Sequence, residues 1–312
     1  MIVCLAANPS VDRLFEVERL TKGDIHRPSG FVQVAGGKGL NVARAAVALG
    51  AEVCAVTILR GHSGRWLQEA LAAEGIDGEF VWTHGENRSS LSVADRDSAG
   101  LTEFYEHGEV APSAAWVELA HAAIGRCAPG GWLTISGSMP RGAPDDGYRD
   151  LIVEARDAGV HVALDAEGGR LAAALPAEPD VVKVNVAEAG ELLGIPTARR
   201  DDSLVAASKI RAMAGGDGHA GIVTRGAEGV MLAAPDGTLT EGVLYVRGRF
   251  PVGSGDAFLA GLVAALDRGD PWEDALRLGL GAGAANAEMP GAARFDPDRA
   301  RTLAREADVR VL

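Results

Sequence analysis

The chain has 312 residues, of which 47% are hydrophobic, 23% charged and 5% aromatic, a composition typical of soluble globular proteins and unlike that of disordered, collagenous or membrane proteins. Its formal net charge of −13 argues against a general nucleic-acid or anionic-membrane surface, so an anionic small molecule would need a locally basic pocket. The isolated residues Cys4, Cys54 and Cys127 predict neither a disulfide framework nor a thiolate zinc site, and they favour a reducing cytoplasm.

The first residues, MIVCLAANPS, lack the basic segment and the long apolar segment of a signal peptide. No later run approaches the roughly 20 apolar residues needed to span a bilayer. We therefore expect a cytoplasmic protein that is neither exported nor inserted in a membrane.

Short β-branched segments alternate with longer Ala-, Leu-, Glu- and Arg-rich segments of helical period, the pattern of a parallel sheet with crossover helices. We predict core strands at Ile2–Ala7, Glu52–Ile58, Trp132–Ser136, His161–Ala166, Val181–Asn185 and Gly221–Thr224. Helices are predicted at Leu40–Leu49, Ser63–Glu74, Ser113–Cys127, Asp145–Ala158, Val186–Leu193, Ser203–Ala214, Gly255–Arg268 and Trp272–Glu288. Gly50 and Gly75 follow the first two helices, where a left-handed C-terminal cap is common.

Two segments, Arg13–Val34 and Leu91–Glu106, show strand-like alternation without an intervening helix of useful length. We predict that they form an antiparallel flap, or lid, over one edge of the α/β core. Covers of this kind exclude water from a reactive centre.

The strongest local motif is Val252–Phe258, with the sequence VGSGDAF, directly before an apolar helical segment. Its glycines permit a tight turn and leave N–H groups free at a helix N-terminus, where phosphate groups bind. Asp256 lies in the first turn, where it is placed either to accept the proton of an attacking hydroxyl or only to cap the helix. Phe258 stands where a dinucleotide fingerprint needs its last glycine, and no Walker-type P-loop occurs, so neither nucleotide-binding motif is predicted.

A second glycine cluster, Ala35–Asn41 (AGGKGLN), opens a predicted helix and offers backbone donors, a lysine and an amide to a polar ligand, unless it is only a hinge. Asp12 follows the first core strand, at the sheet edge where open α/β proteins bind ligands. Its carboxylate suits two sugar hydroxyls, although turn chemistry explains NPSVD equally well.

The segment Ser136–Gly142 (SGSMPRG) follows another core strand and adds hydroxyls, amides and a guanidinium at the same edge. Together with Lys38 and Arg88 it predicts a basic pocket for a phosphate already on the substrate, the alternative being that each arginine is a solvated surface charge.

Asn185 and Glu188 open a helix directly after Lys183. Their three-residue spacing suits residues that orient the waters of a hydrated Mg²⁺ ion, and it is also the signature of a capping box. Further on, Thr224–Gly229 (TRGAEG) ends a strand in a glycine turn that would suit nucleotide phosphate oxygens, although such a turn alone is not specific.

Seven motifs between Ile2 and about Pro290 resemble, in sequence and in order, those of the ribokinase/PfkB family of ATP-dependent sugar kinases. They are NPSVD, GGKGLN, NRSS, SGSMPRG, KVNVAE, TRGAEG and GSGD. The segments around Asp12, Arg88 and Arg141 are most similar to the branch of 1-phosphofructokinase and tagatose-6-phosphate kinase. The resemblance implies a ribokinase-like three-layer α/β/α core with a mostly parallel central sheet and a small β lid, as one domain over residues 1–312.

Carried over by position, the resemblance implies that Asp256 is the catalytic base and that an anion hole is formed by Gly253, Ser254 and Gly255. The sugar hydroxyls would be held by Asp12, Gly37 and Asn41, and the existing phosphate by Lys38, Arg88, Ser138 and Arg141. The ATP side would comprise Lys183, Asn185, Glu188, Thr224, Gly226, Gly229 and Asn286, with Mg²⁺ held through water by Asn185 and Glu188. Ser90 stands in place of an amide of the family's TRxN segment, which leaves the attacked hydroxyl open.

The resulting hypothesis is phosphoryl transfer from MgATP to fructose 1-phosphate, fructose 6-phosphate or tagatose 6-phosphate, giving the bisphosphate. The alternatives are a kinase of an unphosphorylated sugar or nucleoside and a catalytically silent sugar-phosphate sensor. Asp256, Asn185 and Glu188 argue against the sensor, because a pure binder needs neither a base nor a metal-water clamp. We expect no nucleic-acid or membrane partner, and we expect a homodimer formed through the exposed strand edges of the lid.

Overall fold

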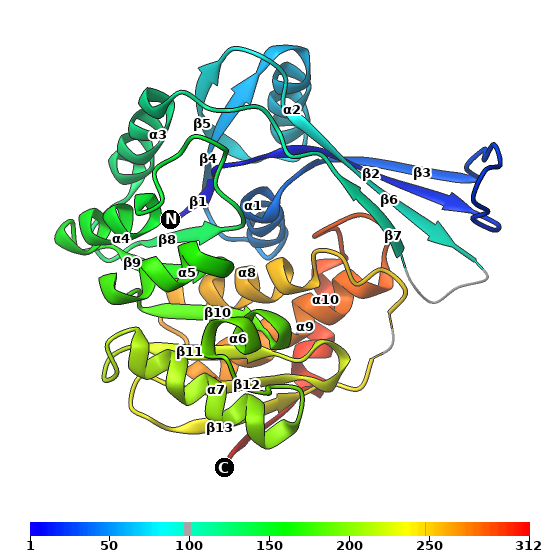
Figure 1. Ribbon diagram of the computed structural model, residues 1–312. Coiled ribbons are helices and arrows are strands. Elements are labelled where there is room, and N and C mark those ends of the chain that lie inside the picture. The colour runs from blue at the N-terminus through cyan, green and yellow to red at the C-terminus, as the bar shows by residue number, and fades with distance from the viewer. Residues whose placement is uncertain (97–100, 247) are drawn as a thin grey trace.

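Two β-sheets form the framework of the computed structural model, which describes residues 1–96, 101–246 and 248–312 (Figure 1). In this part of the chain the larger sheet runs in the order β5 (Asp77–Thr83), β4 (Val53–Arg60), β1 (Ile2–Ala6), β8 (Trp132–Ser136), β9 (His161–Asp165), β10 (Val181–Asn185), β11 (Ala220–Thr224), β12 (Val230–Ala233), β13 (Leu239–Val243) and β14 (Asp308–Val311). The strands from β5 to β11 are parallel, whereas β12, β13 and β14 add antiparallel strands at one edge.

Helices cover both faces of this sheet, which is why the central strands β1 and β4 are buried along their whole length. One face packs against α1 (Lys38–Ala48), α2 (Gly61–Ala73), α8 (Ser254–Asp267), α9 (Trp272–Glu288) and α10 (Pro297–Glu306). The other packs against α3 (Ser113–Arg126), α4 (Gly147–Asp157), α5 (Gly168–Ala174), α6 (Val186–Leu193) and α7 (Arg200–Met213). The predicted three-layer α/β/α core is confirmed, with one hydrophobic core on each side of the sheet.

The predicted core strands and helices all occur, with ends that differ by up to three residues. Gly50 and Gly75 have φ values of 90° and 70° directly after α1 and α2, as a left-handed cap requires. The sequence analysis did not predict α5, α10, β5, β12, β13, β14 or the 3₁₀ turns Leu175–Ala177 and Gly226–Glu228. Most of these unpredicted elements are short or lie at the edges of the fold.

The predicted lid is a second sheet, in the order β3 (Gly30–Gly36), β2 (Ser10–Val17), β6 (Arg88–Asp95) and β7 (Leu101–Tyr105). It projects from one side of the core in Figure 1. Residues 97–100 of the predicted lid range lie outside the described part of the chain. The outer pairs are antiparallel, but β2 and β6 are parallel, so the prediction of an antiparallel flap is wrong for its central pair.

The cause of this parallel pairing is that both strands leave the core in the same direction. β2 begins four residues after β1 ends, and β6 begins soon after β5, which is parallel to β1 through β4. Pairing starts at Ser10 with Arg88 and includes Asp12 with Ser90, so the lid begins nearer the core than predicted. Asp12 and Arg88 therefore lie on lid strands, whereas the sequence analysis placed Asp12 between the first core strand and a lid that began at Arg13.

Strand β1 is the point where the strand order reverses, since β4 lies on one side of it and β8 on the other. Ligands of open α/β sheets bind at the carboxyl ends of the strands at such a point. The lid strand β2 starts here, directly beyond β1. In the described residues, no helix has the length and apolar character required to cross a bilayer.

Candidate active site

A cavity of about 930 Å³ lies at the carboxyl ends of β1, β8, β10 and β11, between the N-termini of α1 and α8 and the lid. It is large enough for two small ligands bound end to end. Among the described residues, it brings together these sequence-predicted positions: Asp12, Gly37, Lys38, Asn41, Arg88, Ser138, Arg141, Lys183, Asn185, Glu188, Thr224, Gly226, Gly229, Gly253, Ser254, Gly255 and Asp256. Asn286 is the predicted residue that does not line it.

The GSGD segment forms the N-terminus of α8. Gly253 is the N-cap residue and has a left-handed backbone, with φ at 83°, and no side chain caps the helix. A Cβ atom on Gly255 would lie 3.1 Å from Lys183 Nζ, so the absence of a side chain lets the lysine approach the helix closely. The arrangement leaves backbone N–H groups facing the cavity at the positive end of a helix, which suits a phosphoryl group.

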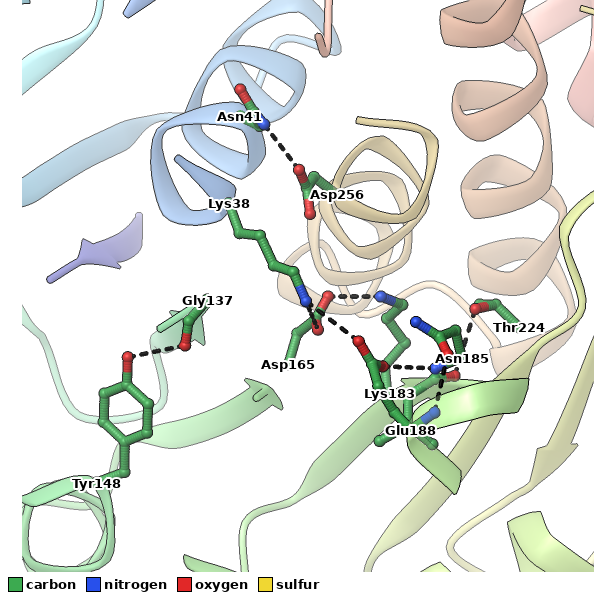
Figure 2. A network of polar contacts seen from close by, with 11 residues as sticks. Lys38, Asn41, Gly137, Tyr148, Asp165, Lys183, Asn185, Glu188, Thr224 and Asp256 are labelled. Atoms are coloured by element: carbon green, nitrogen blue, oxygen red, sulfur yellow. Dashed lines mark hydrogen bonds and ion pairs between the residues drawn. The ribbon is translucent and has the colours of Figure 1, made fainter. Parts of the chain in front are cut away.

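Asp256 is buried, with 6% of its surface exposed, and its Oδ2 accepts a hydrogen bond of 2.8 Å from Asn41 Nδ2 (Figure 2). This contact replaces the capping role considered from the sequence. Burial, followed by the nearby Asp165 carboxylate, raises the pKa of Asp256 to about 6, against the opposing effect of Lys183, Lys38 and Asn41. A carboxylate with such a pKa is suited to accept a proton near neutral pH.

Arg44 fixes the orientation of Asn41. Its Nη1 donates to Asn41 Oδ1 at 3.1 Å, its Nε donates to Glu74 Oε2 at 2.7 Å, and it also donates to the carbonyl of Ala35. With the amide oxygen of Asn41 occupied in this way, the amide nitrogen faces Asp256. The sequence analysis missed Arg44 because a buried arginine on an Ala-rich helix carries no local motif.

The buried carboxylate of Asp165, near Asp256, forms ion pairs with both Lys38 and Lys183 (Figure 2). Its Oδ1 lies 3.1 Å from Lys38 Nζ and its Oδ2 lies 2.5 Å from Lys183 Nζ, and it is fully buried. Burial alone would raise the pKa of Asp165, but Lys183 and Lys38 hold it below its ordinary value, and Asp165 in turn raises the pKa of Lys38. The cluster holds the side chains of both lysines at the cavity wall.

The sequence analysis also missed Asp165, although a signal was present. The residue ends a predicted core strand and precedes the glycine pair Gly168–Gly169, which is the kind of placement that singled out Asp12. The structure also shows that Lys38 Nζ contacts Asp165 and, at 3.4 Å, Glu188 Oε1. Its predicted contact with a substrate phosphate stays a prediction.

Asn185 and Glu188 form a capping box at the start of α6, one of the two interpretations of their spacing. Asn185 Oδ1 accepts from the Glu188 amide at 2.9 Å, and Glu188 Oε2 accepts from the Asn185 amide at 2.7 Å. Both side chains also line the cavity, so the box holds them at its wall. In residues 1–96, 101–246 and 248–312 no group of three or more His, Cys, Asp or Glu side chains is placed to chelate a metal. A Mg²⁺ ion at this wall would need water and phosphate oxygens as ligands, which fits these two residues.

The lid end of the cavity is polar. Asp12 accepts a hydrogen bond of 2.5 Å from Ser10 Oγ, and burial raises its pKa. A Cβ atom on Gly36 would lie 2.0 Å from the Asp12 carboxylate, so this close approach requires glycine. Arg88 donates through Nε and Nη2 to the carbonyl of Asn8, at 3.3 and 3.2 Å.

Ser138 and Arg141 complete this end of the cavity. Ser138 Oγ accepts from Asn8 Nδ2 at 3.1 Å, which links it to the residue that holds Arg88. Arg141 is exposed at the cavity rim. Two guanidinium groups therefore share one end of a cavity in an otherwise acidic protein.

The opposite end of the cavity has an apolar lining that the sequence analysis did not identify. Thr224, Gly226 and Gly229 of the TRGAEG motif lie beside it, and the Thr224 hydroxyl donates to the carbonyl of Val184 at 3.3 Å. The apolar lining comes from β12, the segment after β13, and α9, and comprises Val230, Leu244, Val246, Leu280, Ala284 and Ala287. Such a surface suits a flat heterocycle rather than a sugar.

Comparison with known proteins assigns the family. Residues 3–299 match the family model described as the pfkB family carbohydrate kinases. The chain belongs to this family. It is 33% identical over 281 residues to 1-phosphofructokinase of Haloferax volcanii, covering 90% of this chain and 88% of that relative. It is 31% identical to 1-phosphofructokinase of Rhodobacter capsulatus, covering 100% and 98% of the two chains.

Solved structures of kinases share the fold. Phosphofructokinase-2 of Escherichia coli in complex with substrates and products is 25% identical and superposes with a TM-score of 0.89 over 98% of both chains. A possible 1-phosphofructokinase of Thermotoga maritima, 21% identical, has a TM-score of 0.89 over 100% of this chain and 99% of that one. The predicted membership of the ribokinase/PfkB family and the predicted fold class are thereby confirmed. In this carbohydrate kinase, Asp256, Lys38 and Lys183 line one cavity.

The charges around Asp256 predict how turnover depends on pH. In the wild type kcat/KM should fall as the pH drops through about 6, because protonated Asp256 cannot accept a proton. Lys183 lowers the pKa of Asp256, so Lys183→Met should move this acid limb to higher pH. Any titration of the substrate itself is common to both enzymes and cancels in the comparison. An acid limb that stays in place or moves to lower pH would contradict the assignment of Asp256 as the titrating group.

Proposed function

We propose that the protein transfers the γ-phosphoryl group of ATP to a hydroxyl of a phosphorylated ketohexose, giving the bisphosphate. Fructose 1-phosphate, fructose 6-phosphate and tagatose 6-phosphate are the candidate acceptors. The observation that carries the proposal is one cavity with a polar, arginine-bearing end and an apolar end, joined at Asp256 and the start of α8. The relatives named 1-phosphofructokinase support the same substrate class.

Each end of the cavity has a distinct part in the proposal. Asp12 and Asn41 would bind sugar hydroxyls, while Arg88, Ser138 and Arg141 would bind the phosphate that the sugar already carries. At the other end, Thr224, Gly226 and Gly229 would contact nucleotide phosphates, beside the apolar surface for the base. The two ligands would then meet between Asp256 and the amides of α8.

In the proposed mechanism, Asp256 accepts the proton of the attacking hydroxyl as the bond between that oxygen and the γ-phosphorus forms. The bond between the γ-phosphorus and the β,γ-bridging oxygen breaks, and ADP leaves with that electron pair. The N–H groups of Gly253 and Gly255 stabilise the negative charge of the transferring group, and Lys183 adds a positive charge beside them. The Ser254 N–H donates to the Pro251 carbonyl at 3.1 Å and so holds the turn that presents these groups. Bound Mg²⁺ would neutralise charge on the phosphate oxygens, and Asn185 and Glu188 would hold it through water. The protein supplies position and charge rather than covalent chemistry.

The first test of this proposal is a substrate panel with a matched variant. ADP release with MgATP should occur with one or more of the three ketose phosphates and not with fructose, ribose or adenosine. Asp256→Asn should lower kcat by about 10²–10⁴-fold, the range for loss of a general base, with little change in ATP affinity. Near-wild-type turnover in the variant would remove Asp256 as the base. Preference for a free sugar or nucleoside would favour the first alternative, and silence with retained sugar-phosphate binding would favour the sensor.

A second test addresses the phosphate pocket. Arg88→Ala should raise KM for the sugar phosphate at least tenfold and leave KM for ATP within about twofold, because Arg88 lies at the lid end of the cavity. Arg126→Ala is a matched control, since Arg126 pairs with Glu79 on the surface and does not line the cavity. Equal rises in both KM values would show that Arg88 acts on the site as a whole and not on the sugar phosphate.

We further propose that two copies associate through the lid. The strands β3 and β7 are the edges of the lid sheet. On these strands 59% of the surface of Phe31, 59% of that of Phe104 and 58% of that of Tyr105 is exposed. Exposed aromatic side chains beside unpaired strand edges suit a second copy of the same surface. Escherichia coli phosphofructokinase-2, with the same fold, has a tetrameric inhibited form.

Sedimentation analysis tests the lid interface. The wild type should have twice the chain mass at micromolar concentration, and the double variant Phe31→Asp, Phe104→Asp should have the mass of one chain. Val117→Asp, which places the same charge at an exposed valine on α3, should remain a dimer. A monomeric wild type, or equal loss of the dimer in the Val117 control, would overturn the proposal.

A further inference from the structure

Asn286 does not lie where the resemblance placed it. It is a residue of α9 with no exposed surface, and it is absent from the wall of the cavity. A direct contact with bound nucleotide is therefore not available to its side chain in this structure. Its polar atoms contact the backbone of two neighbouring loops.

The amide nitrogen of Asn286 contacts three oxygens of the segment that leads into α8. Nδ2 lies 2.9 Å from the carbonyl of Val252, 2.9 Å from Ser254 Oγ and 3.4 Å from the carbonyl of Phe250. Two N–H groups thus hold the segment directly before and at the start of the anion hole. These bonds also fix which end of the amide carries nitrogen.

The amide oxygen of Asn286 contacts the second loop. Oδ1 accepts a hydrogen bond of 2.6 Å from the Ala293 backbone. Ala293 has a left-handed backbone, with φ at 57°, which is unfavourable for a residue with a Cβ atom and persists only where its surroundings impose it. The Asn286 side chain is one of the contacts that impose this conformation.

The two loops held by Asn286 also touch one another. A Cβ atom on Gly253 would lie 2.7 Å from the Ala293 nitrogen, so Gly253, at φ 83°, packs against the same amide that Asn286 binds. A shift of Ala293 would therefore reach Gly253 directly. The hydrogen bonds of one buried side chain define the backbone on both sides of this contact.

We infer that Asn286 is a positioning residue that holds the N–H groups at the start of α8 in the geometry needed for phosphoryl transfer. The inference deepens the proposed function and rests on it for the identity of the transferred group. An anion hole accelerates the reaction only when its donors are fixed before the charge develops. Loss of this clamp should therefore lower kcat and spare the binding of a nucleotide that lacks the transferring group.

The test compares Asn286→Ala with Leu276→Ala, a matched control that removes a buried side chain from the same helix away from both loops and the cavity. Asn286→Ala should lower kcat at least 30-fold, with the inhibition constant of ADP within threefold of wild type. Leu276→Ala should keep kcat within twofold at a temperature where both variants are folded. A tenfold rise in the ADP inhibition constant with kcat retained would instead show a direct nucleotide contact and overturn the inference.

A milder variant keeps the test independent of folding. Ser254→Ala retains the backbone N–H and removes the hydroxyl that Asn286 binds, so it should lower kcat about 3–10-fold. In the Asn286→Ala background the same change should have no further effect, because the two residues act through one contact. Independent effects that multiply would overturn the inference.

Amide hydrogen exchange of the ligand-free protein separates this inference from the proposed function. Exchange of the amides of residues 253–256 should rise at least tenfold in Asn286→Ala and stay unchanged in Leu276→Ala. If the wild type turned over no sugar phosphate, the proposed function would fail while this measurement still decided whether the clamp exists. Unchanged exchange in Asn286→Ala would refute the clamp whatever the substrate.

Discussion

The buried carboxylate of Asp165 is the interaction on which the rest of the site depends. One buried carboxylate between two ammonium groups anchors both lysine side chains, and Lys38 also pairs with Glu188 at 3.4 Å. A buried ion pair contributes little net stability, because removing its charges from water offsets most of their attraction. Its value here is positional, since Lys38 and Lys183 would otherwise extend into solvent. The same field acts on Asp256, whose pKa reflects burial and Asp165 on one side and the two lysines on the other.

Close backbone approach sets where these charges lie. A Cβ atom on Gly39 would lie 2.2 Å from the carbonyl of Leu5, so α1 packs directly against the end of β1. That contact brings Lys38 and Asn41, on the first turn of α1, to the switch point of the sheet. Gly255 does the same for α8 by leaving room for Lys183. Helix N-termini and lysines share the cavity because glycine removes the side chains that would separate them.

Sequence patterns predicted the central architecture because buried parallel strands and amphipathic helices have distinct periods. The motifs located the cavity residues because each follows a core strand or opens a helix, and the carboxyl ends of parallel strands meet at one edge. Asp165 had a local signal that was overlooked, whereas the roles of Arg44 and Asn286 have non-local causes. Arg44 becomes significant only when Glu74, Asn41 and the end of β3 surround it. Asn286 belongs to the right region of the chain, yet its side chain points to the backbone behind the anion hole, which no spacing rule reveals.

The parallel pair at the centre of the lid carries two residues that line the cavity. Asp12 is on β2 and Arg88 on β6, and the same strands continue outward into the exposed sheet. Rotation of that sheet relative to the core would carry both side chains with it, so under the proposed function lid orientation and acceptor affinity would be coupled. By thermodynamic reciprocity, any contact that favours one lid orientation at the outer end changes affinity at the inner end by the same factor. A short ribbon of strands thus connects the periphery of this kinase directly to the wall of its cavity.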